Sequence, residues 1–128
     1  MVLESPTTIR KIPVTVDNVS AVKIRWLYYQ TSAEGEKDMQ IRISEIDGNG
    51  MYVKEDGSNA KYLMAMPLDQ NAAVTVTYSN FNLNEYDAVY TVPIASINEL
   101  NFEVRINDVI ANQITPSNPL VLELGFYA

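Results

Sequence analysis

Carboxylate groups are the main chemically reactive side chains in this sequence of 128 residues. There are 16 aspartate and glutamate residues, no histidine and no cysteine. The lack of histidine excludes Ser-His-Asp machinery, imidazole bases and histidine-dependent zinc sites, and the lack of cysteine excludes thiolate nucleophiles and ligands. A glycosidase-type reaction would need two carboxyl groups facing each other across about 5–10 Å of a cleft.

The positions of the carboxylates do not favour such a pair. They fall in polar segments such as "EGEKD" at 34–38 and "KEDGS" at 54–58, or on the polar faces of predicted strands. There they solvate the surface and discourage pairing between the strand edges of different molecules. We therefore predict no catalytic residues and no enzyme activity.

One segment, "IDGNGMY", has the opening spacing of a calcium-binding EF-hand loop, with Asp47 and Asn49. That loop requires glycine at its sixth position and a bidentate glutamate at its twelfth, where this chain has Tyr52 and Ser58. Asp-Gly and Asn-Gly between apolar runs are typical of a hairpin turn. We predict a turn here, with no metal and no cofactor; a calcium ion in a lectin-style loop is the alternative.

The elements that carry these residues have an apolar period of two. In "ELNFEVRIN" at 99–107, Leu100, Phe102 and Val104 share one side of an extended chain. The same alternation recurs in the segments 8–17, 21–30, 39–46, 51–53, 61–67, 73–78, 88–93 and 119–128, with turn-forming residues between them. The pattern predicts one all-β domain over 1–128 with about eight strands, an antiparallel two-sheet sandwich or a barrel, in which Pro13 marks an edge strand.

The inward phase of these segments predicts the core residues. Its members are Ile24, Trp26, Ile41, Ile43, Val74, Val76, Phe102, Val104, Leu122 and Leu124.

Two segments are apolar on both faces. In "WLYYQ", Leu27 and Tyr29 lie on the side that lysine and arginine occupy earlier in the same strand, and "YLMAM" contains Leu63 in a similar setting. Either a loop or the other sheet covers these residues, or another protein chain does, because contiguous exposed apolar surface marks interfaces. Under the second interpretation Leu27, Tyr29 and Leu63 form a candidate interface.

The net charge of −7 argues against nucleic acid as a partner. We expect no membrane span, because no uncharged apolar run approaches the roughly 18–20 residues that a spanning helix needs. The opening residues "MVLESPTTIRK" have no basic segment leading into an apolar stretch, so we expect no secretory signal at this end.

The order of segments from "QIRISEIDGNGMYV" through "KYLMAMPLD" and "TVPIASINELNFEVRIND" to "PLVLELGF" resembles a group of viral proteins. These are the single jelly-roll minor capsid and penton-type proteins of large double-stranded DNA viruses, virophages and polinton-like viruses. The resemblance covers roughly residues 39 to 127. The matching residues are Pro93, Ile94, Ile97, Leu100, Phe102, Val104, Arg105, Asp108, Leu120, Leu122 and Leu124.

The resemblance implies a single jelly roll and a structural subunit of a virion. Its expected partners are copies of itself and other capsid proteins. The alternative is a non-catalytic, lectin-like carbohydrate-binding module that stacks sugars on exposed aromatic rings. Candidate rings for that role are Trp26, if it is not in the core, and the pairs Tyr28 with Tyr29 and Tyr52 with Tyr62.

Overall fold

The computed structural model describes residues 1–46, 50–53, 57, 59–79 and 89–127, and within these ranges it contains strands and no helix. Two antiparallel sheets, of four and five strands, pack as a sandwich, as predicted. No helix in the described ranges could cross a bilayer. The strands are β1 (Val2–Leu3), β2 (Thr7–Gln30), β3 (Asp38–Ile43), β4 (Gly50–Val53), β5 (Asn59–Tyr62), β6 (Met64–Pro67), β7 (Thr75–Ser79), β8 (Val89–Ile106), β9 (Val109–Ile110) and β10 (Leu120–Tyr127).

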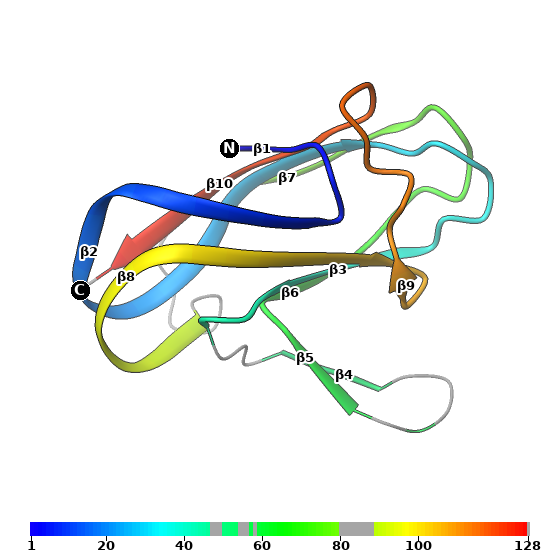
Figure 1. The fold of residues 1–128 in the computed structure, drawn as a ribbon. Helices are drawn as coiled ribbons and strands as arrows, with labels where there is room; N and C mark the ends of the chain where they lie inside the picture. The colour runs from blue at the N-terminus through cyan, green and yellow to red at the C-terminus, as the bar shows by residue number, and fades with distance from the viewer. Residues whose placement is uncertain (47–49, 54–56, 58, 80–88, 128) are drawn as a thin grey trace.

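Two of these strands are much longer than the sequence predicted. Strand β2 has 24 residues and joins two segments that we expected to be separate, and β8 likewise has 18. The two strands pair antiparallel from Thr7 opposite Glu103 to Val22 opposite Val89. Figure 1 shows this ribbon bending at one end of the molecule, so that it runs through both layers.

The bent ribbon determines which strands belong to each layer. One layer contains the first part of β2, the last part of β8, β3 and β6, and the short β9 pairs with the end of β8. The other contains β1, β10, the last part of β2, β7 and the first part of β8. Strands β4 and β5 pair with each other as a separate hairpin.

Pro13 lies where the β2–β8 ladder is interrupted. Paired residues stop at Lys11 opposite Glu99 and resume at Val16 opposite Ile97, and proline has no N–H to donate to a ladder. Residues 7–11 pair only with β8 in the described part of the chain, so they form the predicted sheet edge.

A β-bulge in β2 changes which residues face the core. Glu123 pairs with Trp26 and Leu124 pairs with Ile24, so Arg25 is an extra residue inserted between these two pairs. An extra residue reverses the alternation of the strand. Ile24 therefore faces inward before the bulge, and Leu27 faces inward after it.

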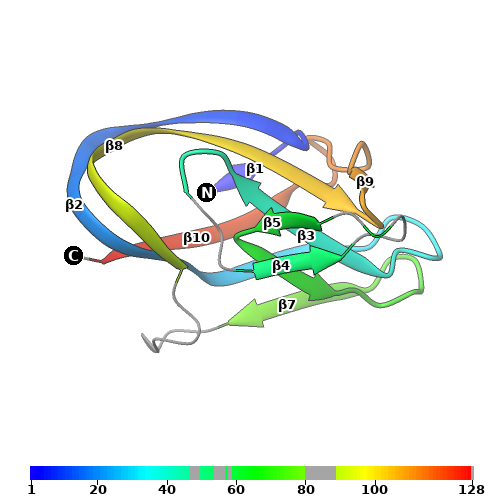
Figure 2. The same cartoon turned by 90° about the horizontal axis from the view of Figure 1, so that it is seen from below.

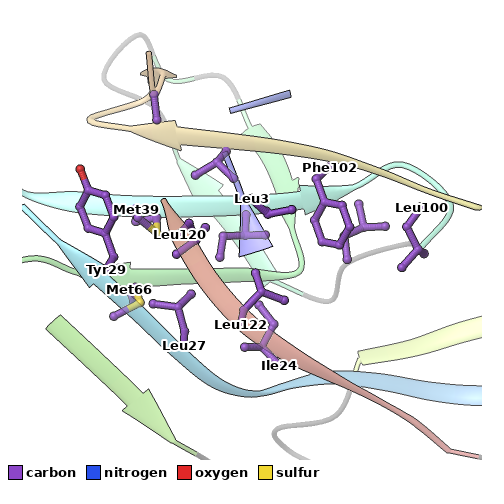
Figure 3. Close-up of a cluster of buried hydrophobic side chains, with 14 of the residues drawn as sticks. Leu3, Ile24, Leu27, Tyr29, Met39, Met66, Leu100, Phe102, Leu120 and Leu122 are labelled. Atoms are coloured by element: carbon purple, nitrogen blue, oxygen red, sulfur yellow. The ribbon is translucent and has the colours of Figure 1, made fainter. Parts of the chain in front are cut away.

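Six of the predicted core residues are buried: Ile24, Ile41, Ile43, Phe102, Val104 and Leu122. Val74, Val76, Leu124 and Trp26 are half-buried, and of these Val76 and Leu124 pack against the core. For Trp26 the prediction of a core position is wrong, because the bulge precedes it. Figure 3 shows the buried cluster, in which side chains from both layers meet, including Leu3, Met39 and Leu120.

Truncating the centre of this cluster should destabilise the protein strongly. Phe102 is 3% exposed and Leu122 is fully buried. We expect Phe102→Ala to lower the free energy of unfolding by about 3–5 kcal/mol and Leu122→Ala by about 2–5 kcal/mol. Chemical denaturation measures both, with the 63%-exposed Ile9 as the Ile9→Ala control. Losses below about 1 kcal/mol in both core variants would contradict this packing.

Candidate interaction surface

The structure corrects the predicted interface. Leu27 is 1% exposed, Tyr29 is fully buried, and Leu63 is half-buried and packs against the core. The first two lie inside the molecule, among the core side chains (Figure 3), so they are not available to a partner. The interpretation in which the rest of the fold covers them is therefore correct. They face inward because the Arg25 bulge reverses the alternation of β2.

The outward face of the same layer carries a row of three apolar side chains and one threonine that the sequence did not predict. Val2, Val121, Tyr28 and Thr77 are successive cross-strand partners on β1, β10, β2 and β7. Directly opposed residues point to the same side of a sheet. Val2 is 41% and Tyr28 is 42% exposed, while Thr77 is exposed and Val121 is half-buried. We call these four residues the outer row.

One feature of the sequence could have indicated this row. In the segment 21–30 of β2 the polar residues Lys23 and Arg25 lie at odd positions, but Gln30 lies at an even one. A change of parity within one strand implies an inserted residue between the two sets.

Beside the outer row, Trp26 is held by an acidic partner. Its Nε1 donates a short hydrogen bond to Glu123 Oε2, and an Arg25 guanidinium nitrogen lies 2.9 Å from Glu123 Oε1. Both charged side chains are substantially exposed, so the ion pair adds little stability of its own. Together these contacts fix the orientation of the indole at the edge of the outer row.

Gly125 leaves room for another aromatic side chain near Arg25. A Cβ at this position would lie 2.6 Å from the Tyr127 hydroxyl oxygen and 2.9 Å from Arg25 Cδ. A larger residue at this position would therefore require the Tyr127 and Arg25 side chains to shift away from the backbone.

Neither of the two tyrosine pairs expected for a lectin, Tyr28 with Tyr29 and Tyr52 with Tyr62, has both of its rings exposed. Tyr29 is fully buried and Tyr62 is 3% exposed, while the side chain of Tyr52 lies outside the described residues. The turn with Asp47 and Asn49 also lies outside them. Within the described ranges, no group of three or more acidic, histidine or cysteine side chains is placed to hold a metal ion.

A buried carboxylate fastens one end of the sandwich. Glu36 is 4% exposed and accepts hydrogen bonds from the Tyr29 hydroxyl at 3.2 Å, the Ser32 hydroxyl at 2.8 Å and the Gln113 amide at 3.2 Å. The Ser32 backbone N–H adds a fourth donor at 3.2 Å. These donors come from β2, its following loop and the segment before β10, so the network ties three parts of the chain together. Its role is structural, and we call this set of hydrogen bonds the Glu36 staple.

A second polar cluster surrounds the turn between β8 and β9. Asn107 and Asp108 both have positive φ, at 52° and 64°, as a type I′ hairpin turn requires. The Asn107 side chain accepts from Lys37 N at 2.8 Å and donates to the Gly35 carbonyl at 2.8 Å. Tyr62 donates to the Asp108 carboxylate at 3.3 Å. These bonds link the turn to the loop before β3 and to strand β5.

A small cleft of about 270 Å³ lies between β2 and β10. Typical ligand pockets have about 300–1,000 Å³, so this space is small for a ligand site. Its lining residues are Met1, Arg10, Lys11, Ile12, Leu100, Glu123, Leu124 and Phe126.

No protein-family model, no curated protein and no solved structure matches this chain.

We expect the protein to lose stability at alkaline pH, because Tyr29 is buried next to Glu36. Burial and, secondly, the neighbouring Glu36 charge raise the pKa of Tyr29 well above its ordinary value. The unfolded tyrosine ionises near pH 10, whereas the folded one stays neutral. The contribution of Tyr29 is thus complete below about pH 10 and is lost as the pH rises above it, by up to about 1.4 kcal/mol per pH unit.

The free energy of unfolding measured between about pH 8 and pH 11 tests this expectation. Tyr29→Phe should flatten the alkaline decline and lower stability at neutral pH by about 1–3 kcal/mol, because Glu36 loses a buried donor. An alkaline decline in Tyr29→Phe as steep as in the unmodified protein would show that Tyr29 does not cause it.

Proposed function

We propose that the protein is a viral structural subunit, a minor capsid or penton-type protein that acts by assembly with copies of itself and with other capsid proteins in the virion. The proposal is supported by the resemblance of segments from "QIRISEIDG" to "PLVLELGF" and by the sandwich fold. The main structural observation that supports the proposal is the outer row.

The outer row has the composition of a contact surface. The row crosses four strands, with the two valines on one side of Tyr28 and Thr77 on the other, and Trp26 lies beside it with its indole N–H bonded to Glu123. Buried tyrosine and tryptophan are the side chains that most often dominate binding energy at interfaces. A stable contact would bury about 1,200 Å² or more in total, with the acidic residues kept to its rim.

The negative charge of the chain agrees with a role in a shell. A protein with a net charge of −7 is repelled by nucleic acid phosphates. It would therefore contact neighbouring proteins and not the packaged genome. The charge also opposes self-association at low ionic strength, so assembly should strengthen as salt screens it.

The carbohydrate-binding alternative is favoured by one specific arrangement. Trp26 and the 42%-exposed Tyr28 are on the outward side of β2 after the bulge. Aromatic rings of this kind could stack on sugars. The indole is half-buried and bonded to Glu123, however, which leaves Tyr28 as the more accessible ring.

A charge placed in the outer row tests the proposal. Tyr28→Asp should weaken assembly at least tenfold, which corresponds to about 1.4 kcal/mol, because it buries an unpaired carboxylate in the contact. Native mass measurement and electron microscopy of the purified chain, over a range of salt and protein concentrations, would follow the assemblies.

Two variants control for general damage. Ile9→Asp places the same charge on an exposed residue of the other layer and should leave assembly unchanged. Leu27→Asp buries the charge in the core and should unfold the monomer. A protein that forms no assembly and binds glycans on an array, with the binding lost in Tyr28→Asp, would replace the capsid proposal with the carbohydrate-binding one.

A further inference from the structure

Strand β7 is an open sheet edge. Its five residues pair with β2 in one continuous register, from Trp26 opposite Ser79 to Gln30 opposite Thr75. In the described part of the chain, β7 has no second strand on its other side. Figure 2 shows it along the lower margin of the molecule.

Within the described residues, this edge lacks the charges, proline and bulges that keep other sheet edges from pairing. Natural edge strands are protected by charges, proline, bulges or extreme shortness. Among the other described edges, β1 has two residues, β6 has four and ends in Pro67, and residues 7–11 of β2 carry Arg10 and Lys11. Strand β7, "TVTYS", has no charge, no proline and no register shift, and four of its five residues are β-branched or aromatic.

The backbone groups that face the open side can be assigned. Thr31 N–H donates to the Val74 carbonyl at 2.9 Å, which fixes the hydrogen-bonded positions just before β7. Hydrogen-bonded pairs alternate along an antiparallel ladder, so Val76 and Tyr78 bond to β2. The N–H and C=O groups on the open side belong to Thr75, Thr77 and Ser79.

These groups are self-complementary. If two copies of β7 lie antiparallel about a two-fold axis at Thr77, then Thr77 faces its own copy and Thr75 faces Ser79. All of these are hydrogen-bonded pairs, which gives about six main-chain hydrogen bonds. Val76 and Tyr78 then form the closer, non-bonded pairs. Threonine with threonine or serine, and an aromatic with a β-branched residue, are among the favourable cross-strand pairs.

We propose that β7 pairs with β7 of a second copy in this register, so that the two five-stranded layers join into one continuous sheet. A two-fold contact of one surface with itself is the commonest form of oligomer. The dimer does not depend on the capsid proposal and would serve a carbohydrate-binding protein equally.

The same register would lengthen the outer row. Thr77 is the last member of the row in one copy and would face Thr77 of the other copy. The row would then run from Val2 of one molecule, through both threonines, to Val2 of the next. This doubled outer row is the part of the inference that rests on the proposed function.

Single cysteines test the register directly, because the chain has none of its own. Two residues in a hydrogen-bonded antiparallel pair have Cα atoms about 5.5 Å apart, within the range that a disulfide spans. Thr77→Cys should therefore give a covalent dimer under mild oxidation. Thr75→Cys is the matched control: it is the same residue type on the same exposed face, but its copies would be offset by four residues, about 13 Å along the strand.

A charge at the axis tests the dimer without a crosslink. In Thr77→Lys two ammonium groups would face each other, so sedimentation should change from dimer to monomer while the thermal unfolding of the monomer stays intact. Tyr28→Asp should retain the dimer even where it abolishes larger assemblies, which separates this inference from the proposed function. A monomeric wild-type protein, a dimer that survives Thr77→Lys, or Thr75→Cys crosslinking as well as Thr77→Cys would each overturn the β7 pairing.

Discussion

The pairing of β2 with β10, with Arg25 as an inserted residue, determines the inner and outer surfaces of one whole layer. Before Arg25 the residues Val22 and Ile24 face the core, and after it Leu27 and Tyr29 do. Without the insertion, Trp26 and Tyr28 would enter the core and Leu27 and Tyr29 would face solvent. The bulge therefore creates both the Tyr29–Glu36 staple inside and the outer row outside.

At one end of the sandwich, polar contacts hold the loop between β2 and β3. Glu36 accepts hydrogen bonds from three segments, and the Asn107 side chain binds the loop before β3 through both its amide oxygen and its amide nitrogen. A buried carboxylate is costly unless its oxygens are satisfied, so these contacts must form together. They hold the loops in place while the long ribbon of β2 and β8 joins the two layers.

The sequence predicts the fold class well because the period of two depends only on local order. In β8 the predicted phase of Leu100, Phe102 and Val104 is correct, since no register shift interrupts that part of the strand. The phase of β2 after Arg25 could not be predicted from alternation, because a bulge is a property of two paired strands. Glu36 is a further example, since in "SAEGEKD" it resembles any solvated loop carboxylate, and only its distant partner Gln113 reveals its burial.

The bulge turns Trp26 and Tyr28 outward and buries Leu27 and Tyr29. The absence of native cysteine allows a direct measurement, in which single cysteines replace each of these four residues in turn and the rate of thiol labelling is followed under native conditions. The structure predicts fast labelling at positions 26 and 28 and slow labelling, limited by unfolding, at 27 and 29. Fast labelling at 27 and 29 with protection at 26 and 28 would contradict the bulge and, with it, the outer row.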